Sequence, residues 1–229
     1  MNATITTTAR YLPDRILTNF DLEKMVDTSD EWIRLRTGIS KRHLVAEGEA
    51  TSDMCAAVMK QLLERSGKSP EDIDLLIVAT ITPDVFVAST AAIVLDKVGA
   101  TNAWGFDLAA ACSGFLYGIE TGSKMIESGQ YKNVVVIGAD TMSSIIDYTD
   151  RNTCVLFGDG AGGVLLEPTD SNGGILDSLL FSDGSGSKAL QVPAGGSLHP
   201  ANGKKSHLEQ KRSKKPKPKD TNHPKEHKN

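Results

Sequence analysis

Short apolar runs alternate with helix-like segments along most of this chain, and this alternation limits the possible folds more than any other feature. Residues 73–80 and 133–139 are rich in branched apolar side chains and are too short to be buried helices. Such runs are typical of strands buried on both faces of a sheet. Helical patterns lie between them, for example at 89–98 and after residue 112. The alternation predicts an α/β fold with a mostly parallel sheet covered by helices.

Capping residues predict where several of the helices begin and end. Thr28-Ser-Asp-Glu31 has the pattern of a capping box, so we expect a helix that starts there and ends at Gly38. Residues 51–53 should start another helix, which ends at Gly67. Further strands are expected at 103–108, 162–166 and 174–181.

The charge of the chain is unevenly distributed. Residues 1–201 hold 15 Lys and Arg against 26 Asp and Glu, a net charge of −11, whereas residues 202–229 hold 10 against 3, a net charge of +7. The second segment has one apolar residue, Leu208, and three prolines among its lysines, so we expect a disordered basic tail. A nucleic-acid-binding tail is one interpretation, but no aromatic residue is present to stack on bases. We favour a solvated or frameshifted end, and expect no nucleic-acid partner.

Cysteine usage and hydropathy indicate the compartment. Three widely spaced cysteines argue against a disulfide framework and favour a reducing environment. The first ten residues lack the pattern of a secretory signal, and no apolar run is long enough to cross a bilayer. We therefore expect a cytoplasmic protein with no membrane partner. We also expect no metal site, because no His, Cys and Asp side chains recur with ligand spacing.

Cys112 is the candidate nucleophile. It follows an apolar strand-like run and three alanines, and a Ser-Gly pair and a helical pattern come after it. A thiol at a helix N-terminus lies where unpaired N–H groups and the helix dipole favour the thiolate, the form that attacks an acyl carbon. The alternative interpretation is a small buried hydrophobic residue without chemistry, and Cys55 and Cys154 match that description.

Several segments together resemble 3-oxoacyl-acyl-carrier-protein synthase III, also called β-ketoacyl-acyl-carrier-protein synthase III, of the thiolase-like superfamily. They lie in order and extend to about residue 201. The matching stretches are 11–13, 18–19, 27–33, 36–39, 107–114, 149–151, 157–162, 182–184 and 192–197.

The resemblance implies a thiolase-like fold of two βαβαβαββ halves and a homodimer. Residues 1–170 would be the first half, which bears the nucleophile, and 171–201 would be the start of a second half that is largely missing before the tail at 202–229. The implied reaction has two stages. Cys112 takes an acyl group from a short acyl-coenzyme A, and malonyl on acyl carrier protein then loses carbon dioxide and attacks that thioester, which initiates fatty-acid synthesis.

The resemblance also implies substrate contacts. Thr28, Trp32, Arg36 and Arg151 match positions that contact coenzyme A, which acts as a thioester substrate, with no further cofactor implied. An indole can stack on adenine, and guanidinium groups can pair with phosphates. The alternatives are a half-buried aromatic residue on an amphipathic helix and solvated arginines.

Four residues correspond to the acyl pocket: Ile81, Val87, Leu156 and Phe157. The family commonly has an aromatic residue and a proline where this chain has Val87 and Ala88, so we expect a roomier pocket that accepts a longer or branched starter. The histidine and asparagine that complete the family's active site have no counterpart in the matched region.

Two expectations follow from the missing second half. The first sheet should expose a large apolar face, which would make the chain marginally stable alone. We then expect this chain to be competent at most for acylation of Cys112, and not for the full condensation. Two alternatives stay open, namely a thiolase-fold acyltransferase of secondary metabolism and a non-catalytic fragment.

Overall fold

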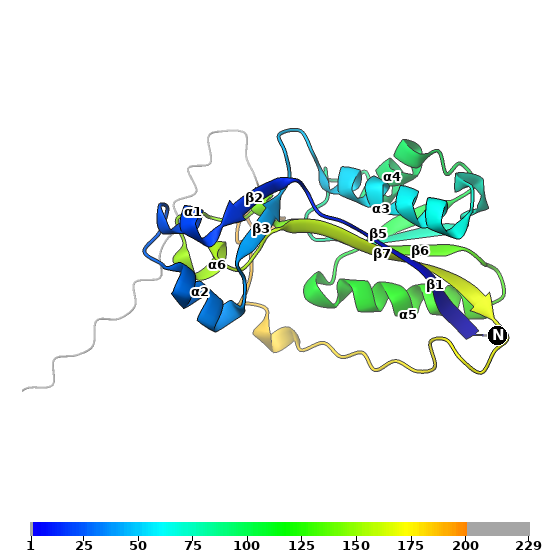
Figure 1. The fold of residues 1–229 in the computed structure, drawn as a ribbon. Coiled ribbons are helices and arrows are strands. Elements are labelled where there is room, and N and C mark those ends of the chain that lie inside the picture. Colours follow the sequence, from blue (N-terminus) through cyan, green and yellow to red (C-terminus); the bar gives the residue numbers. More distant parts are fainter. Residues whose placement is uncertain (1, 201–229) are drawn as a thin grey trace, which may run out of the picture. The chain divides into compact units, whose positions relative to one another are not determined.

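A five-stranded sheet forms the centre of the computed structural model, which describes residues 2–200 (Figure 1). The strand order is β1-β7-β6-β4-β5. Strand β4 pairs in parallel with β5 and β6, whereas β7 is antiparallel to both of its neighbours, β6 and β1. Strands β1, β4, β5 and β6 therefore run in one direction and β7 runs against them, which agrees with the predicted mostly parallel sheet. The strands span β1 Asn2–Tyr11, β4 Leu75–Ala79, β5 Trp104–Leu108, β6 Val134–Thr141 and β7 Asp159–Thr169.

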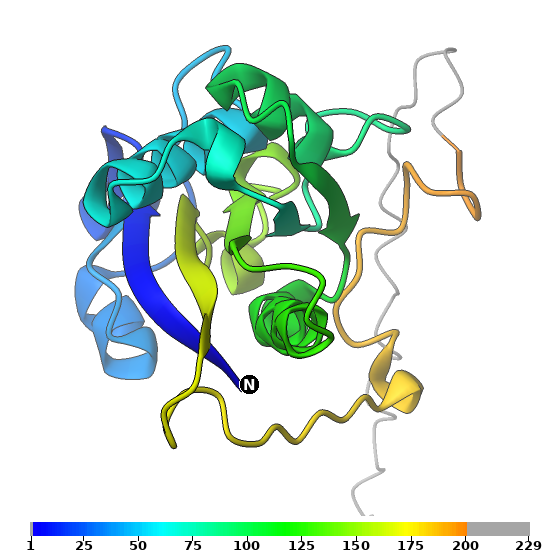
Figure 2. The ribbon, with the colours of Figure 1, turned by 90° about the vertical axis from the view of Figure 1, so that its right-hand side faces the viewer.

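Helices cover both faces of this sheet. Helices α3 (Thr51–Ser66) and α4 (Thr90–Val98) lie on one face, and α5 (Gly114–Glu127) lies on the other (Figure 2). Every residue of β4 is buried, as are the first four of β6. The expectation of a largely exposed sheet face is wrong, because α5 already covers that face. The sequence β1-α3-β4-α4-β5-α5-β6-β7 is the expected βαβαβαββ order.

Three glycines bring α5 unusually close to the sheet. A Cβ at Gly118 would lie 2.8 Å from Val136 Cγ1, and one at Gly122 would lie 3.0 Å from both Val134 Cγ1 and Leu166 Cδ1. At Gly114 the nearest atom would be Ala79 Cβ, at 3.2 Å. Spaced four residues apart, these glycines form the face of α5 that packs on β4, β6 and β7.

An insertion between β1 and α3 forms a smaller layer. Strands β2 (Arg15–Thr18) and β3 (Lys41–Leu44) pair in antiparallel fashion, and the connection between them holds α1 (Asn19–Glu23) and α2 (Asp30–Thr37). The short helix α6 (Arg151–Cys154) packs against them. This packing forms a separate apolar cluster with a fully buried centre: Leu22, Ile33, Cys154 and Val155.

Helix α2 starts one residue later than the capping-box pattern predicts. Its N-cap is Ser29, whose side chain accepts a hydrogen bond from Trp32 N at 3.1 Å. Ser29 has the extended backbone of an N-cap, so Thr28 lies outside the helix and Glu31 is exposed. The predicted end at Gly38 is confirmed, with a left-handed φ of 72°.

The segment after β7 differs from its prediction. Residues 174–181 form no strand, because after Ile175 N donates to Ala3 O at 2.8 Å the chain leaves the sheet and exposes its apolar side chains. Contacts divide the chain into one unit up to Phe181 and a second from Ser182. The described part of the second unit has one helical turn, Gly184–Gly186, capped by Asp183. The predicted basic tail at 202–229 lies outside the described residues.

Within residues 2–200, every helix is too short or too polar to cross a membrane.

Candidate active site

A cavity of about 590 Å³ lies at the carboxyl ends of the parallel strands and contains Cys112. In α/β sheets this edge is where ligands bind, because the connections after the strands leave a crevice there. The wall is built mostly of small residues, which leave room for a ligand next to the backbone. Its larger side chains are Cys112, Phe115, Asp140 and Met142; the rest are Ala9, Ala79, Ala111, Gly138, Ala139, Gly158, Gly160, Gly162 and Gly163.

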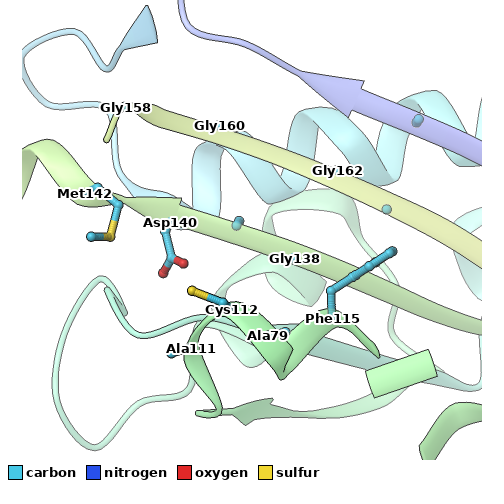
Figure 3. A pocket seen from close by; sticks show the side chains of 13 residues that line it. Ala79, Ala111, Cys112, Phe115, Gly138, Asp140, Met142, Gly158, Gly160 and Gly162 are labelled. Atoms are coloured by element: carbon cyan, nitrogen blue, oxygen red, sulfur yellow. The ribbon is translucent and has the colours of Figure 1, made fainter. Parts of the chain in front are cut away.

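Cys112 lies in a single helical turn, Ala111–Ser113, that leads from β5 into α5. Its side chain is exposed, and Figure 3 shows it directed into the cavity. Ala111 has a φ of 46°, a left-handed conformation that is uncommon for alanine. The predicted order of strand, turn, cysteine and helix is therefore confirmed, and the cysteine is accessible.

The other two cysteines are buried, as expected for cysteines that only pack. Burial raises the pKa of both the Cys55 and the Cys154 thiol, which disfavours their reactive thiolate forms. Cys112 is thus the exposed one of three free thiols in the chain.

Asp140 is a cavity residue that the sequence analysis missed. Figure 3 shows its carboxylate and the Cys112 sulfur directed toward one another across the cavity. One carboxylate oxygen, Oδ1, accepts hydrogen bonds from Thr80 Oγ1 at 3.0 Å, Ile81 N at 2.9 Å and Thr82 Oγ1 at 3.0 Å. These bonds tie the end of β6 to the segment after β4. The available signal was an aspartate directly after the apolar run 133–139 that predicts a buried strand, on the edge where the Cys112 turn also begins.

The glycine-rich segment after α6 forms the opposite wall. Gly158 directly precedes β7, and Gly160 lies within it. A Cβ at Gly158 would lie 3.0 Å from both Arg42 Cβ and His43 O, so the wall packs closely on β3. Asp159 accepts hydrogen bonds from Ser143 N and Val45 N, at 2.8 and 2.9 Å, which anchors the same wall.

A second constellation forms around Trp32. The guanidinium carbon of Arg151 lies 4.4 Å from the indole centroid, and that of Arg36 lies 4.7 Å from it. The structure thus brings together three of the four residues predicted to contact coenzyme A, from α2 and α6. Among residues 2–200, Thr28 Oγ1 and Arg151 Nε are buried without a hydrogen-bond partner, which is unusual for buried polar groups.

None of the four residues assigned to the acyl pocket lines the cavity in the described structure. Ile81 lies beside it, since its backbone N–H bonds Asp140, and Phe157 directly precedes the wall residue Gly158. Leu156 is 42 % exposed. Val87 is fully exposed on the loop before α4, with a φ of 83°.

Within residues 2–200, no group of three or more His, Cys, Asp or Glu side chains could hold a metal ion. His43 Nδ1 lies 2.6 Å from Pro13 O, and neither it nor His199, the other histidine of that range, lines the Cys112 cavity.

Comparisons with known proteins agree on one group of enzymes. Residues 106–184 match the family described as 3-Oxoacyl-[acyl-carrier-protein (ACP)] synthase III. A curated protein of Chlorobium phaeovibrioides named beta-ketoacyl-[acyl-carrier-protein] synthase III is 60 % identical over 204 residues, which cover 88 % of this chain and 62 % of that protein. The protein of the same name from Chlorobaculum tepidum is 58 % identical with the same coverage. The chain thus spans about three fifths of the length of these relatives.

Solved structures give the same result for the fold. The 3-oxoacyl-[acyl-carrier-protein] synthase III of Aquifex aeolicus is 47 % identical with a TM-score of 0.72, over 74 % of this chain and 55 % of that one. The corresponding enzyme of Thermus thermophilus is 40 % identical with a TM-score of 0.77, over 81 % and 57 % of the two chains. A priming β-ketosynthase of the R1128 polyketide pathway is 35 % identical with a TM-score of 0.72, over 74 % and 51 %. The α/β fold is thiolase-like.

Proposed function

Because the matched part of this chain belongs to the 3-oxoacyl-[acyl-carrier-protein] synthase III family, we propose that Cys112 accepts an acyl group from a short acyl-coenzyme A. The observation that carries the proposal is the exposed thiol of Cys112 at the start of α5, in a cavity with small-residue walls. An acyl chain and the thioester carbonyl need space next to the attacking sulfur, and alanine and glycine leave that space.

The proposed step is a thioester exchange. The Cys112 thiolate forms a bond to the carbonyl carbon, and the carbonyl electron pair moves onto oxygen. The tetrahedral intermediate then re-forms the carbonyl and expels the coenzyme A sulfur, which leaves as a thiolate and takes up a proton. The acyl group stays on Cys112 as a thioester, and no oxidant or cofactor is consumed. N–H groups of the first turn of a helix are the kind of donor that stabilises the transient oxyanion.

The Trp32 cluster is the proposed binding site for the nucleotide part of coenzyme A. Its indole offers an apolar face for adenine, and Arg36 and Arg151 bring two cations for phosphates. In the structure Arg151 covers the ring at 4.4 Å. In this proposal the bound ligand supplies partners to Thr28 Oγ1 and Arg151 Nε, which are buried and have none among the described residues. Thr28 thus joins the site as a hydrogen-bonding group rather than as a helix cap.

The acylation is tested by incubating the full chain with acetyl-coenzyme A and measuring the intact mass. We expect the mass of one acetyl group to be added, and a Cys112→Ala variant to lose it. Peptide mapping provides the internal control, since Cys55 and Cys154 are buried thiols that should stay unmodified. No adduct, or an adduct that persists in Cys112→Ala, would contradict the proposal.

A priming ketosynthase of secondary metabolism is the second candidate function. It is favoured by the 35 % identity to the R1128 priming enzyme and by the small, exposed Val87 in the loop before α4. In the same mass experiment, competing acetyl and branched or longer acyl thioesters separate the two. Strict selection of acetyl favours the fatty-acid role and counts against a roomy acyl pocket at Ile81, Val87, Leu156 and Phe157.

The second stage, condensation with malonyl on acyl carrier protein, belongs to the proposal for the whole enzyme, with acyl carrier protein as the partner. A cytoplasmic location is part of the same proposal and is supported by the three free cysteines.

A homodimer is also proposed. It is supported by β5, which pairs with β4 alone among the described strands and so leaves one edge open.

A further inference from the structure

Arg42 and Asn19 form a buried polar pair that is hydrogen-bonded to both α2 and the end of α6. Arg42, on β3, is 3 % exposed, and Asn19, the first residue of α1, is fully buried. One guanidinium nitrogen of Arg42 donates to Asn19 Oδ1, and the other donates to Val155 O. A buried guanidinium and a buried amide are costly unless they are hydrogen-bonded, so their retention here calls for a reason beyond packing.

Asn19 holds α2 at both of its ends. Its Nδ2 donates to Asp30 Oδ1 at 2.8 Å, in the first turn of α2, and to Ile39 O at 2.9 Å, just after the Gly38 cap. Both of these partners are acceptors and Arg42 is a donor, so every polar position of the amide is used. The isosteric carboxylate of aspartate could keep the Arg42 bond but could not donate to the other two partners.

Arg42 links this pair to α6, the helix that carries Arg151 of the Trp32 cluster. Val155 is the C-cap of α6, the four-residue helix that begins with Arg151. A chain of hydrogen bonds therefore runs from the end of α6 through Arg42 and Asn19 to the two ends of α2. Helix α2 carries Trp32 and Arg36, and α6 carries the Arg151 guanidinium that lies over the indole.

We infer that the Arg42–Asn19 pair is a positioning unit that holds α2 and α6 together, so that Trp32, Arg36 and Arg151 form one site for the adenine and phosphate groups of a nucleotide thioester. The ligand assignment rests on the function proposed above, whereas the placement of the two helices does not. Arg42 and Asn19 are both buried, so neither side chain contacts a ligand in this arrangement. The two terminal nitrogens of Arg42 each have a partner, whereas its Nε is buried without one among residues 2–200.

The apolar cluster around Leu22, Ile33, Cys154 and Val155 also joins these elements, and it is the competing explanation. Apolar packing is non-directional and tolerates small shifts between helices, whereas a guanidinium with two fixed acceptors does not. A conservative substitution of Arg42 separates the two explanations. If apolar packing positions the helices, the substitution leaves Trp32 in place; if the hydrogen bonds position them, it does not. Arg42→Lys keeps the buried charge and the Cβ that packs below Gly158, but it offers one ammonium in place of a two-pronged donor.

The test uses the full chain with Trp104→Phe, which leaves Trp32 as the sole tryptophan and a local fluorescence probe. The variants are Arg42→Lys and Asn19→Asp. The matched control is Lys41→Met, which removes a cation from an exposed neighbouring position on β3. Three quantities are measured: Trp32 emission and acrylamide quenching without ligand, the Kd for coenzyme A, and the rate of Cys112 alkylation by iodoacetamide.

We expect both variants to increase quenching of Trp32, because Arg151 no longer covers its ring. We also expect coenzyme A to bind about tenfold more weakly, the effect of losing one hydrogen bond of ordinary net strength. In both variants the rate of Cys112 alkylation should equal that of the parent, which a general loss of structure would not allow. The Lys41→Met control should equal the parent in all three measured quantities.

Unchanged Trp32 quenching in both folded variants would overturn the inference. Loss of Trp32 order, Cys112 reactivity and thermal stability together in both variants would also overturn it, because the pair would then be a general fold determinant. If the parent chain binds no coenzyme A, the proposed function fails, while the ligand-free Trp32 signal still decides whether the pair positions the cluster.

Discussion

Ala111 adopts a left-handed backbone conformation directly before the nucleophile, with a φ of 46°. Such a residue costs on the order of 1 kcal/mol or more relative to an unstrained one, and strain of this kind persists where the surrounding structure holds it. The turn it makes separates the end of β5 from α5 and directs Cys112 into the cavity. We attribute the strain to that placement of the thiol.

An Ala111→Gly variant should therefore be more stable but less reactive. Glycine adopts positive φ without strain, so we expect the free energy of unfolding to rise by up to about 1 kcal/mol. The looser turn should slow alkylation of Cys112 by iodoacetamide. Ala110→Gly is the matched control, because Ala110 has a φ of −140° and glycine relieves nothing there. Equal effects of both substitutions on urea unfolding would contradict this account.

Individual site residues could be predicted from sequence when their neighbours determine them. Cys112 was found because small residues and a helical pattern surround it, and its exposure and placement are confirmed. Asp140 was missed because its importance comes from Thr80 and Thr82, which are about sixty residues away in the chain. Thr28 was predicted to be the N-cap of α2 because a glutamate follows it three residues later. The spacing alone does not show which of the adjacent residues Thr28 and Ser29 has the extended backbone of an N-cap.

At the scale of elements, α5 depends on its glycine face. A helix-interior Gly→Ala change usually stabilises a helix by about 1 kcal/mol, because alanine is the better helix former. At Gly118 the added Cβ would lie 2.8 Å from Val136 Cγ1, closer than any ordinary contact. Overpacking of a buried site costs about 1–3 kcal/mol, so the clash outweighs the propensity.

We predict that Gly118→Ala lowers the free energy of unfolding by up to about 2 kcal/mol, measured by urea denaturation. A Val136→Ala substitution leaves a cavity on its own, but it makes room for the new methyl group. The double variant should therefore be more stable than the sum of the two single effects predicts. Strict additivity would show that the close approach of α5 to β6 is not what makes alanine unfavourable here.

The central strands β4 and β6 were predictable and the edge strand β1 was not, for a physical reason. Strands β4 and β6 are continuous apolar runs because they are covered on both faces, and the sequence pattern records that burial. Strand β1 is rich in threonine, half-exposed and interrupted by a register shift between Ile5 and Thr7. It is a strand because it pairs with β7, more than 150 residues later in the chain. A local sequence pattern cannot predict a pairing partner at that distance.

For the whole molecule, the coverage of the sheet changes the expectation about stability. With α5 on one face and α3 and α4 on the other, the described part of the chain has packed apolar clusters on both sides of its sheet. The apolar surface that remains is local rather than sheet-wide. The sequence could predict the α/β class and the order of the core elements. It could not predict which apolar surface stays exposed, because that depends on how the helices pack on the sheet.

One part of that remaining surface is the outer edge of β5. Trp104 is 43 % exposed there, with ring centroids 5.9 Å from both Phe106 and Tyr131. The strand has a neighbour on one side only among the described strands, so its other side presents free backbone N–H and C=O groups. An apolar edge strand of this kind is a template for pairing with another strand, and a second copy of this chain offers the same edge in the antiparallel sense.

We predict that the chain forms a dimer through this edge and that Trp104→Glu shifts it toward monomer. A charge on an edge strand opposes strand pairing, and across a twofold axis it would be present on both copies. Light scattering coupled to size exclusion, over a range of protein concentrations, measures the change. Leu35→Glu is the matched control, since it adds the same charge to an exposed leucine on α2, away from the sheet. A monomeric parent chain, or an equal shift in both variants, would rule out β5 as the dimer edge.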